Sequence, residues 1–493
     1  MSTPPGRAPE PGRPTPDLVR LGLVVSLGAI MMQLDTTMTN VATATLLRTF
    51  DVPLTTLQWV GTGYLIAMAT VIPLGGWAME RFGGRAVWTA SLGVFLLGSV
   101  LSGLAWSVPS LIAFRVVQGL GAGLILPVAQ AVLAVAAGPD RLARAMAVLG
   151  VPALLGPVLG PVLGGVIVTD LSWRWIFYVN VPVCLLALAL ARRTVPADRI
   201  GVPGRLDLLG TALLSGGSVA LVAGFADAGR AGTFATAGAV APLALGVALF
   251  GGFVRHALAV RGVAIIDVRL LRERAFGSAG AVMFLGMTVM FGTMSVVPLY
   301  YQQVRGESPL RAGLLMVPFG VGTGVSLILG SRLVARLGAR RLALGGLTAL
   351  LMGNLALTRL DAGTAYPLIG AVQLVGGLGV GTVLVPVMTA SLQGLRADQI
   401  PRASTAVRLL QQLGACFGGA LLLVVLQHRI TVGAAAHGGR ADAAVLGHAF
   451  GESFWWPLAI GVVTLAAAAF LPGPGARAPE PAPALPASSP GPR

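Results

Sequence analysis

Fourteen apolar runs, most of them roughly 20 residues long, constrain the fold of this chain more than any other feature of its sequence. About 20 consecutive apolar residues let an α-helix cross the hydrocarbon core of a bilayer. Because every backbone N–H and C=O must be satisfied there without water, a helix is the favoured structure. The sequence therefore predicts an all-α membrane protein with 14 transmembrane helices. The runs cover residues 20–42, 57–79, 86–106, 110–136, 142–168, 176–191, 207–226, 234–254, 276–299, 311–335, 341–358, 366–391, 403–427 and 453–471.

The composition agrees with a chain that lies mostly in a membrane. Only 11% of the residues are charged, against about 25% in soluble proteins. All 34 basic residues are arginine, so neither a phosphate-binding P-loop nor a Schiff-base lysine is possible. Cys184 and Cys416 both fall in apolar runs, and the four histidines lack the spacing of zinc ligands. We expect no enzyme activity, no cofactor and no metal site.

The formal charge of +16 could indicate nucleic-acid binding or basic loops on the cytoplasmic side of a membrane. No arginine-rich block stands in a soluble segment, so we expect the loops and no nucleic acid. With a cytoplasmic N-terminus, the cytoplasmic segments hold 25 arginines, with Arg332 and Arg408 counted at their borders, and the outer loops hold 8. We expect a multi-pass protein of a bacterial cell membrane with both termini in the cytoplasm.

Three sequence fragments recur at nearly one offset. GLGAGLILPV at Gly119 is repeated as GLGVGTVLVPV at Gly377, and the segments that begin at Arg81 and Arg144 have similar counterparts at nearly the same distance, at Arg336 and Arg402. The repeat predicts two parallel six-helix bundles, 18–191 and 276–471, joined by a linker, 192–275, that carries two extra helices. Two such bundles around a central site suit alternating access. Residues 1–17 and 472–493 are Pro-rich and are expected to be disordered cytoplasmic tails.

Asp35 is the only carboxylate that lies deep inside one of the apolar runs. A carboxylate in hydrocarbon is costly and usually marks an ion or proton pathway. Burial favours its neutral form, whereas a nearby arginine favours the charged form. At about 1.5 Å per residue, Asp35 and Arg115 lie about 10 Å and about 8 Å from the outer ends of their helices, so they can meet. We expect them to couple proton binding to movement; the alternative is a fixed ion pair that stabilises the bundle.

Five segments, in order, resemble the fourteen-span drug:proton antiporter branch of the major facilitator superfamily, and the resemblance extends over residues 18–471. It implies the major facilitator fold and a proton-coupled exporter of the multidrug efflux type, as found in antibiotic resistance. The segments are LDTTMTNVA (Leu34–Ala42), LQWVGTGYLIAMATVIPLGGWAMERFGGR (Leu57–Arg85), RVVQGLGAG (Arg115–Gly123), GPVLGPVLGG (Gly156–Gly165) and WRWIFYVNVP (Trp173–Pro182).

The resemblance also implies roles for particular residues. Asp35 and Arg115 would couple proton movement to transport. A cytoplasmic latch would hold the two halves together, with Glu80 where the family usually has Asp and with Ala335 at the corresponding position of the second half. The antiporter-motif helix would seal the halves against proton leak. The alternatives are a basic loop that sets topology and plain helix packing. The latch consists of Gly76, Glu80, Arg81, Gly83 and Arg85, and the antiporter-motif helix carries Gly156, Pro157, Gly160, Pro161, Gly164 and Gly165.

The substrate cavity is expected between the halves, near the bilayer midplane. The run 311–335 contains no acid, whereas relatives that export dications often carry one in the second half, so we expect a neutral or monocationic hydrophobic cargo. For each candidate lining residue, a hydrogen bond between helices or simple packing is an equally good interpretation. The candidates are Gln33, Thr39, Asn40, Tyr64, Gln118, Met290, Met294, Gln373, Gln411 and Gln412.

The sequence thus predicts a proton-coupled exporter of hydrophobic drugs or related small molecules. Its partners would be a small-molecule substrate, protons and the lipid bilayer, and we expect it to act as a monomer. Two alternatives stay open. One is an exporter dedicated to a single antibiotic or siderophore. The other, from a different class, is a membrane sensor that binds a ligand without transporting it.

Overall fold

The computed structural model describes residues 16–197, 205–260, 265–396, 399–437 and 442–472. Within these ranges the chain forms α-helices and two 3-10 helices and no β-strand, which confirms the predicted all-α class. The helices are α1 (Pro16–Phe50), α2 (Leu54–Val71), η1 (Ile72–Leu74), α3 (Gly75–Phe82), α4 (Gly84–Gly103), α5 (Val108–Asp170), α6 (Trp175–Tyr178), α7 (Asn180–Thr194), α8 (Leu208–Ala231), α9 (Ala237–Ala259), η2 (Val268–Arg272), α10 (Arg274–Gln303), α11 (Pro309–Leu315), α12 (Val317–Leu357), α13 (Tyr366–Leu392), α14 (Ile400–Ala436), α15 (Ala443–Ser453) and α16 (Trp455–Ala468).

Twelve helical segments in the described ranges are long and apolar enough to cross a membrane. The prediction of 14 spans is therefore not confirmed when the helices are judged by their length and composition. The two remaining predicted runs, 142–168 and 341–358, form the second halves of α5 and α12. A straight helix of the 63 residues of α5 would be about 95 Å long, about three times the thickness of the hydrocarbon core.

Both long helices are interrupted at a glycine. Gly138 in α5 has φ 65° and ψ 176°, and Gly338 in α12 has φ 79° and ψ 159°. Such positive φ values are readily adopted only by glycine. Each of these elements is therefore two helices joined at a turn.

The contacts between α1 and α5 show that α5 reverses its direction at Gly138. In the first half of α5, residue numbers fall as those of α1 rise, so the two segments are antiparallel. In the second half both numbers rise together, so the segments are parallel. The first-half contacts are Gly28–Ile125 and Asp35–Arg115, and the second-half contacts are Ser26–Val148 and Met38–Gly164.

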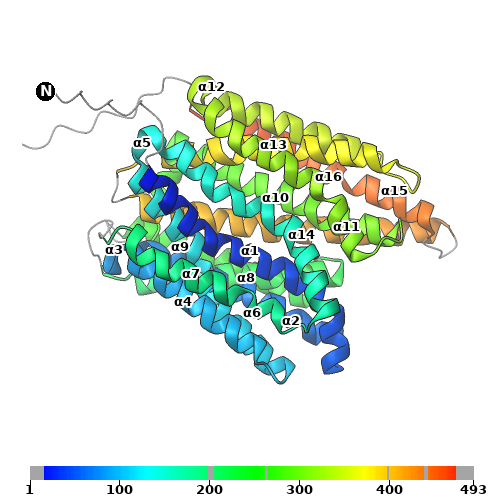
Figure 1. Ribbon diagram of the computed structural model, residues 1–493. Helices are drawn as coiled ribbons and strands as arrows, with labels where there is room; N and C mark the ends of the chain where they lie inside the picture. The colour runs from blue at the N-terminus through cyan, green and yellow to red at the C-terminus, as the bar shows by residue number, and fades with distance from the viewer. Residues whose placement is uncertain (1–15, 198–204, 261–264, 397–398, 438–441, 473–493) are drawn as a thin grey trace, which may run out of the picture.

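The helices run side by side, with α2 and α4 along one edge of the molecule and α12 and α13 along the opposite edge (Figure 1). The first half of the chain packs mainly through α5, which contacts α1, α2 and α4. In the second half, α12 packs on α13 and α10 packs on α14. The helix α8 contacts both α2 and α14. It is held to α2 by a hydrogen bond from Ser215 Oγ to the Thr70 carbonyl oxygen (2.7 Å).

Close approach between α4 and α5 depends on glycine. A Cβ atom added to Gly98 would lie 2.4 Å from the backbone N of Gln118, and one added to Gly121 would lie 2.3 Å from that of Phe95. Small residues allow helix backbones in membranes to approach this closely. The contact therefore places α4 directly against the part of α5 that carries Arg115 and Gln118.

We expect Gly98→Ala to lower the thermal unfolding midpoint of the purified protein. The added methyl group forces the α4 and α5 backbones apart, and overpacking of this kind costs about 1–3 kcal/mol. Gly93→Ala is a matched control on the same helix, because no atom lies within 4 Å of its added Cβ. Equal midpoints for the two variants would contradict the packing role of Gly98.

Candidate functional site

Asp35 lies in the middle of α1 and is completely buried. Its Oδ2 forms an ion pair with Nη1 of Arg115 on α5, whose side chain is only 1% exposed. Its Oδ1 accepts hydrogen bonds from Nε2 of Gln118 (2.8 Å) and Nδ2 of Asn180 (3.2 Å). A buried charge is tolerated when it is both paired and hydrogen-bonded. Both carboxylate oxygens meet this requirement.

Ser99 on α4 connects the donors around Asp35. Its Oγ accepts hydrogen bonds from Nε2 of Gln118 (3.2 Å) and Nδ2 of Asn180 (2.8 Å), and it donates to the carbonyl oxygen of Phe177 (3.0 Å). We call Asp35, Arg115, Gln118, Asn180 and Ser99 the Asp35 network. Its members come from α1, α4, α5 and α7, so a change in charge at Asp35 acts on four helices at once.

The position of the Arg115 guanidinium is set by several groups besides Asp35. Nη1 donates to Oε1 of Gln118 (2.7 Å), and Nε donates to the carbonyl oxygen of Val60 (3.4 Å). Its Cζ lies 4.1 Å from the centre of the Tyr64 ring and 5.7 Å from that of Phe177. A cation above an aromatic face is attracted to it. Arg115 therefore has partners that remain when Asp35 becomes neutral.

The structure brings Asp35 and Arg115 together, as predicted from their similar distances to the outer ends of their helices. Gln118, expected as a cavity residue, belongs instead to the Asp35 network. Ser99 and Asn180 were not predicted. The available signal was that each is a polar residue inside an apolar run, at 86–106 and 176–191.

Glu80 of the proposed latch is also buried, with 2% of its surface exposed. Nε and Nη2 of Arg402, at the start of α14, donate to its two carboxylate oxygens at 2.6 and 2.8 Å. This two-point geometry is the strongest form of the arginine–carboxylate pair. Gly76 lies against Arg402, since an added Cβ would be 3.2 Å from its Cα. The pair joins residues 322 positions apart in the sequence.

The other latch residues have different surroundings. Gly83 has φ 86° and separates α3 from α4. Nη1 of Arg85 donates to the carbonyl oxygen of Arg192 (3.3 Å), and Arg81 is exposed. Arg402, the partner of Glu80, was not predicted as a site residue, although it begins one of the repeated fragments.

The antiporter-motif helix forms part of the second half of α5. Gly160 lies against Thr37 and Gly164 against Met38, so both allow α5 to approach α1 closely. Gly165 lies near Leu310 of α11, where an added Cβ would be 3.8 Å from its side chain. Of the motif residues, Gly156, Pro157 and Pro161 lie outside the part of the chain whose side chains and contacts are described.

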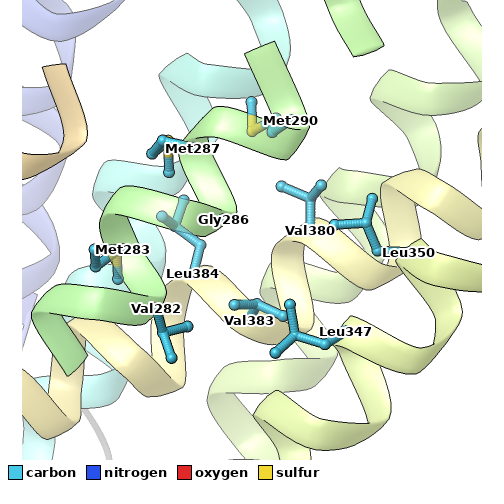
Figure 2. A pocket seen from close by; sticks show the side chains of 10 residues that line it. All are labelled: Val282, Met283, Gly286, Met287, Met290, Leu347, Leu350, Val380, Val383 and Leu384. Atoms are coloured by element: carbon cyan, nitrogen blue, oxygen red, sulfur yellow. The ribbon is translucent and has the colours of Figure 1, made fainter. Parts of the chain in front are cut away.

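The ten candidate cavity residues do not surround one cavity. Met290, Met294 and Gln373 line a space of about 20 Å³ that also touches Asn354 and Thr293. A second space of about 20 Å³ is lined by apolar side chains of α10, α12 and α13, among them Met290 (Figure 2). Ligand pockets for drug-sized molecules have volumes of about 300–1,000 Å³. Both spaces are therefore too small to hold such a cargo in the conformation described.

The remaining candidates have local partners. Gln411 donates to Sδ of Met283 (3.3 Å), and Gln412 donates to Sγ of Cys416 (3.6 Å). Thr39 donates to the carbonyl oxygen of Asp35 (2.7 Å). Tyr64 stacks on Arg115, and Gln33 is half-buried. The side chain of Asn40 lies outside the described residues. Among the residues described, no group of three or more His, Cys, Asp or Glu side chains could hold a metal.

An all-helical, multi-pass fold with a paired acid and arginine inside the membrane is typical of secondary membrane transporters. The chain belongs to the Major Facilitator Superfamily, whose family model matches residues 25–419. The family membership predicted from the sequence is thereby confirmed.

Two bacterial relatives are similar over most of their length. The chain is 36% identical to the Multidrug resistance protein B homolog of Mycobacterium tuberculosis over 434 residues, which cover 87% of this chain and 80% of the relative. It is 33% identical to the Puromycin resistance protein pur8 of Streptomyces alboniger over 455 residues, covering 90% and 89%.

Solved structures share the fold at low sequence identity. The human organic anion transporter MFSD10 superposes with a TM-score of 0.62 at 18% identity, covering 91% of this chain and 100% of that one. The proton:xylose symporter XylE superposes with a TM-score of 0.62 at 17% identity, covering 91% and 94%. At this identity the comparison supports the helical arrangement alone.

Proposed function

We propose that the protein is a proton-coupled exporter, an antiporter, of hydrophobic drugs or related small molecules. The observation that carries the proposal is the buried Asp35–Arg115 pair, held by Gln118, Asn180 and Ser99. Its setting is a chain that is 36% identical to a relative named for multidrug resistance and 33% identical to one named for puromycin resistance. An acid inside a membrane protein of this class is a natural proton carrier.

The Asp35 network supports a simple exchange of one proton. In the charged form, Oδ2 pairs with Arg115, and Oδ1 accepts from Gln118 and Asn180. A proton on Asp35 removes the ion pair, while Arg115 keeps Gln118, Val60 and the Tyr64 ring as partners. Since the network joins four helices, we propose that protonation loosens α1 from α4, α5 and α7. One proton entering at 100 mV supplies about 2.3 kcal/mol, enough for a roughly fifty-fold gradient of neutral cargo.

We further propose that Glu80 and Arg402 close the cytoplasmic side when the cavity faces outward. Breaking this pair would free the start of α14 from α3. The second half of α5, with Gly160 and Gly164 against α1, would stay closed against proton leak. The proposed rocking units are the bundles 18–191 and 276–471, with 192–275 inserted between them.

The topology we propose has 14 crossings and two cytoplasmic termini. In support, α5 doubles back at Gly138, and α12 is interrupted in the same way at Gly338. Counting each as two spans adds two crossings to the twelve helical segments that qualify by length and composition in the described residues. An even number then places both ends of the chain on one side.

The test is a proton-flux assay on the purified protein in proteoliposomes that contain a pH-sensitive dye. A panel of hydrophobic antibiotics, with puromycin and lincomycin among them, is added under an imposed pH gradient. We expect several compounds to trigger proton movement and to accumulate against their gradient, and we expect nigericin to abolish both. Binding without proton movement would favour the sensor, and a response to one compound alone would favour a dedicated exporter.

A further inference from the structure

Gln373 on α13 has a buried acceptor with no hydrogen-bond partner among the described residues. Only 4% of its surface is exposed, and its Oε1 atom is buried and unbonded. Its Nε2 donates to the Tyr301 hydroxyl oxygen (2.8 Å) and to the Leu315 carbonyl oxygen (3.3 Å). A backbone carbonyl oxygen only accepts, so this second bond fixes which side of the amide carries Nε2. The open group of Gln373 is therefore an acceptor, and whatever binds it must donate a hydrogen bond.

Gln373 lines the space of about 20 Å³ described above, together with Thr293 and Asn354. Oγ1 of Thr293 donates to Oδ1 of Asn354 (2.9 Å), and Nδ2 of Asn354 donates to the Leu350 carbonyl oxygen (2.9 Å). The other side chains that line the space are apolar, and none is charged. A buried acceptor without a donor is costly, so the open Oε1 atom indicates a ligand that supplies one.

The sequence repeat relates the surroundings of Gln373 to the Asp35 network. Gln373 stands four residues before the repeated GLG segment of the second half, the position of Arg115 in the first half. Gly376 stands one residue before that segment, the position of Gln118. Gly376 also lines the space, and a Cβ added to it would meet nothing within 4 Å outside its own helix backbone. The second half therefore has an uncharged side chain in place of Arg115 and open room in place of Gln118.

Two more residues of this space correspond to residues at the proton site. Phe319 precedes the repeated RLGAR fragment by 17 residues, as Tyr64 precedes RFGGR in the first half. Asn354 follows the start of RLGAR by 18 residues, as Ser99 follows the start of RFGGR. Both Phe319 and Asn354 line the space beside Gln373. The space therefore lies where the second half has its counterpart of the proton site.

The wall beside Gln373 contains side chains that can move. Met290 and Leu350 line this space and also the second one, which Figure 2 shows, so they separate the two. Met287 and Met283 continue the lining of the second space along α10 (Figure 2). Methionine side chains are flexible and adapt to partners of different shape. A shift of Met290 would join the spaces, with the open acceptor at one end and apolar side chains along the rest.

We propose that Gln373 binds the cargo through a neutral N–H or O–H group, such as an amide or hydroxyl, on an otherwise apolar molecule. Oε1 accepts this hydrogen bond, and the body of the cargo lies along the methionines of α10. Both spaces are too small for such a molecule as they stand, so it binds in a state of the cycle in which α10 and α13 have moved apart.

The lining also limits the charge of the cargo. None of the side chains that line either space is charged, so an ammonium group would be buried without a partner, which is costly. The proposal rests on the function proposed above. It narrows the expected cargo from neutral or monocationic molecules to neutral molecules with a hydrogen-bond donor.

The proposal is tested with three probes that share one fluorescent body. N-butyl dansylamide carries one N–H donor, N-butyl-N-methyl dansylamide has a methyl group in its place, and dansylethylenediamine adds an ammonium group. Their fluorescence is titrated with the purified full-length protein in lipid nanodiscs, with empty nanodiscs as the blank and without any gradient. We expect N-butyl dansylamide to bind about threefold to tenfold more tightly than the methylated probe, as one neutral hydrogen bond predicts. It should also bind more tightly than the ammonium probe.

Variants of Gln373 and its partner separate hydrogen bonding from folding. Gln373→Met keeps the length of the side chain and removes its acceptor, so the two N-butyl probes should bind within about twofold of each other. Tyr301→Phe is the matched control, because it removes the hydroxyl group that Nε2 of Gln373 binds and leaves Oε1 in place. We expect Tyr301→Phe to keep the preference of the unmodified protein.

Equal affinities of the two N-butyl probes for the unmodified protein, or tightest binding of the ammonium probe, would overturn the proposal. So would a preference that persists in Gln373→Met or is lost equally in Tyr301→Phe. None of these results bears on export itself. Proton flux driven by the antibiotic panel in proteoliposomes is a separate readout, so the role of Gln373 can fail while the exporter function stands. Absence of that flux in the unmodified protein would instead contradict the function.

Discussion

Asp35→Asn is expected to abolish proton-driven export while the protein stays folded. Asparagine has nearly the same shape, and its oxygen can still accept hydrogen bonds from Gln118 and Asn180. In the unmodified protein, Nε2 of Gln118 and Nδ2 of Asn180 lie 2.8 and 3.2 Å from Oδ1 of Asp35. What it loses is the exchangeable proton. We expect accumulation of cargo against its gradient to fall to the level of empty liposomes, measured in proteoliposomes with a defined pH gradient.

The same change leaves Arg115 without its carboxylate, so stability must be measured in parallel. Removing one partner of a buried ion pair costs about 3–5 kcal/mol, and we expect a lower thermal midpoint. The double variant Asp35→Asn, Arg115→Gln removes both charges and should recover part of that midpoint without recovering export. This separates loss of the proton site from loss of folding.

Asp227→Asn provides the matched control. Asp227 also forms an ion pair with an arginine, Arg230, but the two side chains are partly exposed and lie three residues apart on α8. We expect its export to equal that of the unmodified protein. Undiminished gradient-driven export in Asp35→Asn would remove the basis of the proposed coupling.

Charged residues in apolar runs made part of the site predictable from sequence. Asp35 and Arg115 are conspicuous because a charge in hydrocarbon is rare and costly. Ser99 and Asn180 are polar residues inside apolar runs, but uncharged polar residues are common enough in membrane helices that this signal does not single them out. Their role depends on which helices meet, and that is decided by packing such as the Gly98–Gln118 contact.

Pairings distant in sequence could not be predicted for the same reason. Glu80 is recognisable in its motif, but its partner Arg402 follows it by 322 residues. The apolar runs correctly predicted an all-helical fold. They could not show that the turns at Gly138 and Gly338 would be tight enough to leave α5 and α12 almost continuous.

Arg402→Ala is expected to open the cytoplasmic side of the protein. The change removes two charge-assisted hydrogen bonds to a buried carboxylate, at 2.6 and 2.8 Å. Such bonds contribute about 1.5–3 kcal/mol, so the closed state should lose roughly 10-fold to 100-fold in relative population. Thr405→Cys, placed against Gly75 in a protein whose two native cysteines are replaced, reports on this opening. We expect an impermeant maleimide applied from the cytoplasmic side to label it at least about tenfold faster when Arg402 is replaced.

Two further variants show whether the effect belongs to the Glu80–Arg402 pair. Arg429→Ala, on the same helix, breaks a pair with Glu452 in which the side chains are 42% and 36% exposed, and pairs at the solvent-exposed surface contribute only about 0–1 kcal/mol. It should leave labelling unchanged. The exchange Glu80→Arg with Arg402→Glu restores a pair of opposite charges and should slow labelling again. If Arg402→Ala labels no faster than the unmodified protein, the pair does not control access, and closure must depend on the packing of Gly75 and Gly76 against α14.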